Sequence, residues 1–252
     1  MILELDVGNS RIKWRVLDAS CNSEVDSGAA NDLTELTNKI GNGPVITEIR
    51  ASIVRNSHIR DQLVAWAGKT VRVPISIAKV SRSCVGVTNN YEDISRLGID
   101  RWLAMLAAYH RAQTACAIID CGTALTIDVL DASGQHAGGY IVPGLSLMRD
   151  SLELNTGIKL DSTTGNLSTE YGHSTTSAVH NGTFFALLAL IRSCVQAADG
   201  PSKRLEKVYL TGGDASLFAD GLAVGGLLVE LVPTLVLDGL VLACPGKGAV
   251  ED

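Results

Sequence analysis

The chain has 252 residues, of which 46% are hydrophobic and 19% charged, with a formal net charge of −6. This composition supports one or two folded domains with a sizeable core and argues against disorder. The acidic balance and the scattered Lys and Arg argue against a nucleic-acid binder, which favours a basic face. The longest apolar region, 222–244, is interrupted by Glu230, Pro233 and Asp238, so we expect no membrane-spanning helix there.

None of the six cysteines forms a CxxC pair, and Cys116 and Cys121 lie in or beside an apolar strand. This spacing is typical of reduced, mostly buried thiols in a cytoplasmic protein and makes a zinc site improbable. The first residues already follow a strand pattern that carries Glu4 and Asp6, so a signal peptide is not expected.

The first half of the chain predicts strands followed by alternating helices and strands. In order, the pattern predicts a hairpin over 2–18, a loop or edge strand over 20–30, a helix over 32–40, a strand over 45–54, a helix over 56–66 and a strand over 71–77. A charged loop over 86–100 then leads into an Ala-rich helix that ends near Gln113. Because this helix is apolar on most sides, we expect it to be buried between two domains.

The second half repeats this plan. It predicts a hairpin over 117–131, helices over 145–154 and 175–195, a strand over 207–210, a helix over 216–223, a strand over 227–232 and a final helix over 234–243. Residues 155–171 are polar and rich in turn formers, which indicates an exposed loop. The whole pattern favours an α/β fold with mixed sheets.

Two similar turns organise the chain. Asp6-Val7-Gly8-Asn9-Ser10 and Asp120-Cys121-Gly122-Thr123-Ala124 each end an apolar strand and return through β-branched residues. A glycine lets backbone N–H groups approach a ligand closely, and such turns can cradle phosphate beside a cation. The copies lie about half the chain apart, which indicates a duplicated domain with a site in the cleft between the halves. Two ordinary hairpins are the alternative.

Single residues offer further candidates, each with a structural alternative. Asp100 could accept the proton of an attacking hydroxyl, and Arg101 could hold a substrate carboxylate. Alternatively, Asp100 caps a helix and Arg101 lies on the surface. Tyr91 could line a pocket or belong to the core, and Thr175 could simply cap its helix. Lys13 could reach a phosphate or be a solvated strand residue. The turn at 211–214 could hold a nucleotide's sugar or base, or simply join a strand to a helix.

Taken together and in order, these motifs make the chain resemble the type III pantothenate kinases, a family of the acetate and sugar kinase, Hsp70 and actin superfamily. The resemblance covers nearly the whole chain and rests on the residues around Asp6, Lys13, Tyr91, 98–102, 120–128, 138–144 and 211–214. Ser10 stands where threonine is commoner and keeps the hydroxyl. The loop over 155–172 departs most from the family pattern.

The resemblance implies two ribonuclease-H-like domains, placed here at 1–113 and 114–252, and a homodimer. It implies ATP-dependent phosphorylation of pantothenate, the first step toward coenzyme A, with Mg²⁺ on the nucleotide and a monovalent cation, K⁺ or NH₄⁺. Its site residues carry over as Asp100 for the base and Asp120 for the monovalent ion. ATP is held by Asp6, Val7, Gly8, Asn9, Ser10, Arg11, Ile12, Lys13 and Thr123, and pantothenate by Tyr91, Gly98, Ile99, Asp100, Arg101 and Thr175.

Residue spacing alone does not separate pantothenate from another small hydroxy acid. Two other classes remain open at this point. One is a non-catalytic regulator on the same fold, against which the intact Asp6, Asp100 and Asp120 argue. The other is a polyphosphate phosphatase, which would favour a basic channel that the sequence does not contain.

Overall fold

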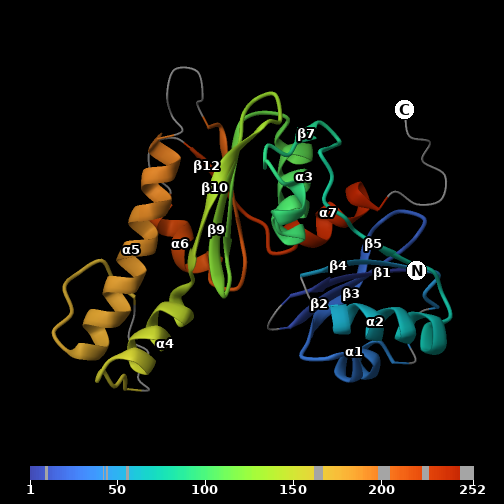
Figure 1. Cartoon of the computed structure of the whole chain (residues 1–252), viewed down its shortest axis with the longest axis horizontal. Coiled ribbons are helices and arrows are strands. Elements are labelled where there is room, and N and C mark those ends of the chain that lie inside the picture. The colour runs from blue at the N-terminus through green and yellow to red at the C-terminus, as the bar shows by residue number, and fades with distance from the viewer. Residues whose placement is uncertain are drawn as a thin grey trace. The chain divides into compact units, whose positions relative to one another are not determined.

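The structure is a computed structural model that describes residues 1–8, 11–41, 43, 45–54, 57–161, 167–197, 205–222 and 227–244. The chain forms two compact units (Figure 1), one of residues 1–110 with 234–252 and the other of residues 111–233. Asn9 and Ser10 of the first turn, and 162–166 of the loop over 155–172, lie outside the described residues.

The first unit is built on a five-stranded mixed sheet of order β3-β2-β1-β4-β5. Its strands are β1 Ile2–Val7, β2 Ile12–Leu17, β3 Glu24–Ala30, β4 Glu48–Ile53 and β5 Ile75–Ile77. β1 pairs antiparallel with β2 and parallel with β4. The helices are α1 Leu33–Ile40, α2 Ser57–Trp66, α3 Ile99–Ala112 and α7 Leu235–Ala243, with a short hairpin of β6 Ser83–Cys84 and β7 Val87–Thr88 before α3.

The two faces of this sheet differ in chemistry because side chains alternate along each strand. Leu3, Leu5 and Val7 of β1 belong to a buried apolar cluster with residues of α1 and α2. Glu4 and Asp6 therefore point to the opposite face, and both are buried. One face of the first sheet thus supplies the core of the unit, and the other carries ionisable groups.

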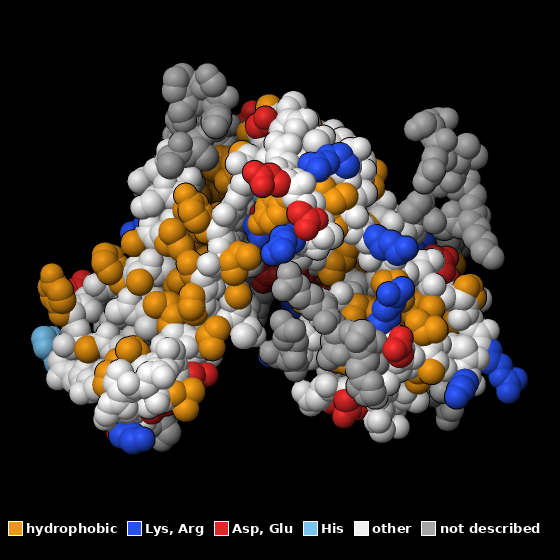
Figure 2. Space-filling model, in the orientation of Figure 1, with side chains coloured by type: hydrophobic (Ala, Val, Ile, Leu, Met, Phe, Trp, Pro, Cys, Tyr) orange, Lys and Arg blue, Asp and Glu red, His pale blue; other side chains and the backbone are white. Residues whose placement is uncertain are grey.

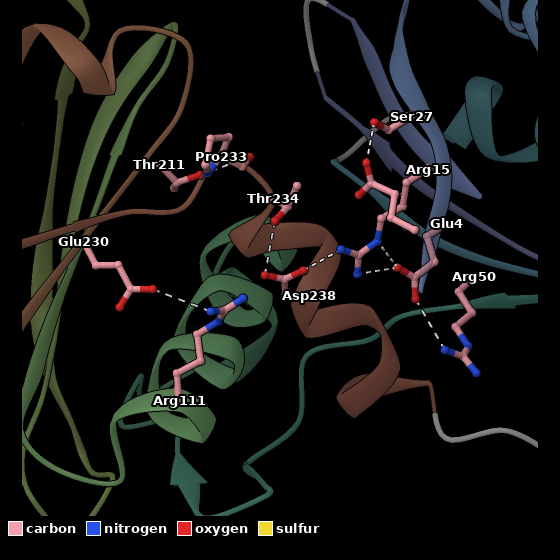
Figure 3. Close-up of polar contacts among 11 residues, drawn as sticks. Glu4, Arg15, Ser27, Arg50, Arg111, Thr211, Glu230, Pro233, Thr234 and Asp238 are labelled. Atoms are coloured by element: carbon pink, nitrogen blue, oxygen red, sulfur yellow. Dashed lines mark hydrogen bonds and ion pairs between the residues drawn. The ribbon is translucent and has the colours of Figure 1, made fainter. Parts of the chain in front are cut away.

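A buried row of charges crosses this second face (Figure 3). Arg15 Nε donates to Glu4 Oε2 at 2.7 Å, and Arg15 Nη1 donates to Asp238 Oδ1 of α7 at 2.5 Å. Arg50 Nη1 lies 3.4 Å from Glu4 Oε1 and extends the row to β4. Burial lowers the pKa of Arg15, but Glu4 and Asp238 outweigh it and raise that pKa above its usual value.

This row explains the one difference between the observed units and the expected domains 1–113 and 114–252. The observed division falls within a few residues of the expected boundary, but the final helix packs with the first unit. Asp238 pairs with Arg15, and the backbone of Leu103 lies so close to Gly239 that a Cβ there would stand 2.2 Å from the Leu103 carbonyl oxygen. Contacts distant in sequence therefore decide where α7 belongs.

The second unit repeats the topology of the first. Its sheet has the order β10-β9-β8-β11-β12, with β8 antiparallel to β9 and parallel to β11. The strands are β8 Cys116–Cys121, β9 Ala124–Leu130, β10 His136–Pro143, β11 Lys207–Thr211 and β12 Leu228–Leu231, and the helices are α4 Leu145–Asn155, α5 Thr175–Ala197 and α6 Ala215–Leu222. Ile119, Ile127 and Leu210 form a buried cluster with residues of α5 and α6. The predicted α/β duplication is confirmed.

One predicted element was wrong in part. The run at 71–77 predicted a strand, but Ala67–Val71 forms a π-helical turn that continues α2. The Ala67 carbonyl accepts hydrogen bonds from the backbone N–H groups of Arg72 and Val73, and Arg72 has a left-handed φ of 59°. The strand is therefore confined to Ile75–Ile77, because these local bonds occupy the backbone before it.

Candidate active site

The first Asp-x-Gly turn joins β1 to β2. The Gly8 N–H donates to the Arg11 carbonyl at 3.2 Å and closes the turn. Of the residues expected to hold ATP here, Val7 and Ile12 direct their side chains into the apolar core, so only their backbone groups face outward. Arg11 is exposed.

Asp6 lies at the end of β1 with a polar residue on each side. In register it pairs with Lys13 of β2 and with Ser52 of β4. The Ser52 hydroxyl donates to Asp6 Oδ1 at 2.6 Å. Burial raises the pKa of Asp6 above its usual value, against the Ser52 hydrogen bond and the charge of Lys13. The negative charge of Asp100 raises it further.

Asp100 lies in the first turn of α3, where the helix dipole favours a negative charge. Its Oδ1 accepts the backbone N–H of Arg101 at 2.9 Å. A Cβ at Gly98 would stand 2.5 Å from this same oxygen, so the glycine leaves space for the carboxylate. Asp100 is partly buried, so the helix-start interaction leaves part of its carboxylate accessible.

Arg101 is buried, unlike the surface residue of the alternative reading. Its Nη1 donates to the Tyr91 hydroxyl at 2.9 Å, and its Cζ lies 5.7 Å from the centre of the Tyr91 ring. The segment that carries Tyr91 is fixed in turn, because Arg82 Nη1 donates to the carbonyls of Asn89 and Tyr91 at 2.7 and 3.0 Å. The first unit thus places a cation suited to a carboxylate next to Asp100.

The second turn, between β8 and β9, is packed more tightly. The Gly122 N–H donates to the Ala124 carbonyl at 3.1 Å, and the Thr123 carbonyl accepts the N–H of Gly144 at 2.9 Å. A Cβ at Gly144 would stand 2.1 Å from the Gly122 carbonyl oxygen, so only glycine allows this approach. The Thr123 side chain remains exposed.

Asp120 precedes this turn as Asp6 precedes the first. It pairs in register with Thr126 of β9 and Thr211 of β11. Gly212, with a φ of 94°, approaches so closely that a Cβ would stand 2.5 Å from Asp120 Oδ1. Within the described residues no three His, Cys, Asp or Glu side chains cluster as metal ligands. A cation at Asp120 would therefore draw its other ligands from hydroxyl, carbonyl or phosphate oxygens, which K⁺ and Mg²⁺ accept.

The start of α5 differs from the expected cap. Ser174 accepts the Ser177 N–H at 3.1 Å and Ser177 accepts the Ser174 N–H at 2.9 Å, so this pair caps the helix. Thr176 instead donates to Asp161 Oδ2 at 3.1 Å. Thr175, the expected substrate contact, is exposed at the first residue of the helix. The sequence Ser174-Thr175-Thr176-Ser177 already favoured a serine cap, because serine caps helices better than threonine.

A cavity of about 150 Å³ adjoins the first turn. Its lining comes from the turn itself and from the helices on the core face of the sheet: Val7, Gly8, Arg11, Ile12, Asn31, Asp32, Leu33, Ile59 and Gln62. It is also smaller than the roughly 300–1,000 Å³ of ordinary ligand pockets. We therefore do not assign the reaction to it.

The residue that the sequence analysis missed is Ser52. A serine within an apolar strand was the available signal, but its value depends on a register that the sequence does not give.

The family model of type III pantothenate kinase matches residues 2–197. A type III pantothenate kinase from Pseudomonas paraeruginosa is 40% identical over 97% of this chain and 99% of its own length.

The chain belongs to the type III pantothenate kinase family. Among solved structures, a protein from Campylobacter jejuni described as a conserved Baf family transcriptional activator has a TM-score of 0.61 at 21% identity, with 94% of each chain covered. The ethanolamine utilization protein EutJ from Carboxydothermus hydrogenoformans has a TM-score of 0.53 at 16% identity, covering 96% of this chain and 89% of its own. At these identities the two structures show the fold alone.

Proposed function

We propose that this kinase transfers the γ-phosphoryl group of ATP to the primary hydroxyl of pantothenate, with Asp100 as the proton acceptor. The hydroxyl oxygen forms a bond to the γ-phosphorus as the bond from that phosphorus to its bridging oxygen breaks. ADP leaves, and the hydroxyl proton passes to Asp100. The supporting observation is that Asp100 lies in the first turn of α3, partly buried and next to the buried Arg101.

Arg101 and Tyr91 are the groups that would receive pantothenate. A guanidinium can bind a carboxylate through two parallel hydrogen bonds, and the Tyr91 hydroxyl holds one of its nitrogens in place. We assign Gly98 and Ile99 to the same pocket through their backbone, because Gly98 begins α3 by accepting the Trp102 N–H. Pantothenate would then present its hydroxyl to Asp100.

ATP would lie on the two glycine turns, with the segment 6–13 and Thr123 as its contacts. Bound Mg²⁺ would supply charge neutralisation for the phosphates. Asp6, buried and held by Ser52, fits such a role directly or through water. Asp120 would hold the monovalent cation, since oxygen-bearing Thr126 and Thr211 flank it in the sheet.

We further propose a homodimer in the cytoplasm. Figure 2 shows hydrophobic side chains gathered over α4 and α5, and the exposed ones in this unit include Tyr140, Ile141, Leu147 and Phe185. Thr175–Gln196 is also long and apolar enough to cross a membrane, with one third of its most apolar window buried, but a single such helix is weak support for a membrane role. A second copy of the chain would cover the same surface.

An apolar helix could also serve as a dimer contact, but the segment 102–108 of α3 does not offer one. Trp102, Leu103, Met105 and Leu106 are completely buried within the chain itself, so they have no surface for a partner. The helix from Thr175 remains the candidate. Light scattering at micromolar concentration should give twice the chain mass, whereas a fully active monomer would contradict the dimer. The six free cysteines fit a reducing compartment.

The test of the reaction is Asp100→Asn. The amide keeps the shape but cannot take the proton, so kcat should fall about 10²–10⁴-fold while ATP affinity stays near that of the parent. Product can be followed as ADP released on addition of pantothenate. A variant that retains more than about half the parent kcat would exclude Asp100 as the acceptor and support a purely structural role at the helix start.

A further inference from the structure

Ser52 occupies a particular place in the first sheet. It lies on β4, completely buried, and pairs in register with Asp6 of the central strand β1. Paired residues on neighbouring strands share a face of the sheet. Ser52 is thus on the ionisable face with Asp6, while its chain neighbours Ala51 and Ile53 pack with the apolar cluster.

The contact that Ser52 makes is with a side chain rather than with backbone. Its hydroxyl donates to Asp6 Oδ1 at 2.6 Å, across 46 residues of sequence. An ionised carboxylate can only accept, so this bond has one direction, and bonds to charged acceptors are short and strong. Holding Oδ1 restricts rotation of the carboxylate and gives Oδ2 one orientation.

The second unit has a hydroxyl at the equivalent place. The sheets share one order and one pattern of strand directions, so β11 in the second corresponds to β4 in the first. Thr211 of β11 pairs in register with Asp120, as Ser52 pairs with Asp6. A buried hydroxyl residue therefore pairs in register with the turn aspartate in both copies, although the Thr211 hydroxyl donates to the Pro233 carbonyl at 3.5 Å.

We propose that Ser52 is a positioning residue that orients the Asp6 carboxylate toward magnesium-bound ATP. This inference rests on the proposed function, in which Asp6 faces the metal–nucleotide complex. Without the hydroxyl, the carboxylate keeps its charge but loses its fixed orientation. Binding of the magnesium complex then weakens, whereas binding of metal-free ATP does not depend on Ser52.

The test is calorimetric titration of Ser52→Ala with ATP, in magnesium and in excess EDTA. A Kd for magnesium–ATP raised about tenfold, with an unchanged Kd in EDTA, would support the proposal; tenfold corresponds to about 1.4 kcal/mol. Ser52→Thr, which keeps a hydroxyl, should remain within about threefold of the parent. Ser76→Ala, an exposed serine on the neighbouring β5, is the matched control and should bind as the parent does.

A double-mutant cycle separates positioning from general destabilisation. In an Asp6→Asn background, Ser52→Ala should have no further effect on magnesium–ATP binding, whereas a purely structural effect would add in full. Ser52→Cys, which nearly keeps the volume but donates weakly, covers the case in which the alanine variant does not fold. The proposal is overturned if Ser52→Ala or Ser52→Cys binds magnesium–ATP within twofold of the parent. It is also overturned if either of these two variants loses affinity for ATP equally in EDTA. Since these are binding measurements, they stay decisive even if the parent fails to phosphorylate pantothenate.

Discussion

Arg15→Met tests the buried row of charges that fastens α7 to the first sheet. Methionine approximates the aliphatic stem but removes both the Glu4 and the Asp238 contacts. Glu4, with no exposed surface, would keep only Arg50 at 3.4 Å. Removing one partner of a buried ion pair costs about 3–5 kcal/mol, and the remaining Arg50 places our expectation near the lower end, at about 3 kcal/mol. For a chain of this size that corresponds to a Tm lowered by roughly 6–12 °C.

Tryptophan fluorescence during heating measures this effect in the right unit, because the three tryptophans, Trp14, Trp66 and Trp102, all belong to the first unit. Arg96→Met is the matched control. Arg96 pairs with Asp93 at 3.4 Å, but its side chain is 78% exposed, so its loss should change stability by less than about 0.5 kcal/mol. If Arg15→Met unfolded within about 2 °C of the parent, or together with Arg96→Met, the buried row would not stabilise the unit as argued.

Three further outcomes are expected. Burial raises the pKa of Asp6, so its ionised form costs folding free energy at pH values above that pKa; Asp6→Asn should raise the Tm of the ligand-free protein near pH 7.5. This gain should shrink as the pH falls toward about 4 and the parent carboxylate takes up its proton, and a variant with a lower Tm near pH 7.5 would contradict the argument. Gly239→Ala places a Cβ 2.2 Å from the Leu103 carbonyl oxygen and should lower the free energy of unfolding, measured by thermal denaturation, by about 1–3 kcal/mol. Gly182→Ala, in open space on α5, is the control and should leave the free energy of unfolding unchanged or raise it. Replacing potassium by sodium should strongly lower the kinase rate of the parent, and Asp120→Ala should be nearly inactive in both salts; equal parent rates in the two salts would remove the monovalent-ion role.

The sequence alone determined the order and type of nearly all elements, because those signals are local. Apolar residues alternate with carboxylates in β1 and form a continuous run in β8, and a glycine stands two residues after the aspartate in both turns. The match between the two turns predicted the duplication, and the ordered motifs predicted the family. The strand at 71–77 was wrong in part because β-branched residues there suit a strand, while the backbone hydrogen bonds of a π-turn compete with it.

Only the tertiary structure decided which distant residues meet. Ser52 reaches Asp6 because β4 lies beside β1 in one register, and a shift of one residue would turn its hydroxyl to the apolar face. Asp238 reaches Arg15 across 223 residues, which assigns the final helix to the first unit. Hydrophobic patterning says which face of an element is buried but not which partner covers it. Sheet order and register supply that information, and with it the neighbours that tune the Asp6 carboxylate.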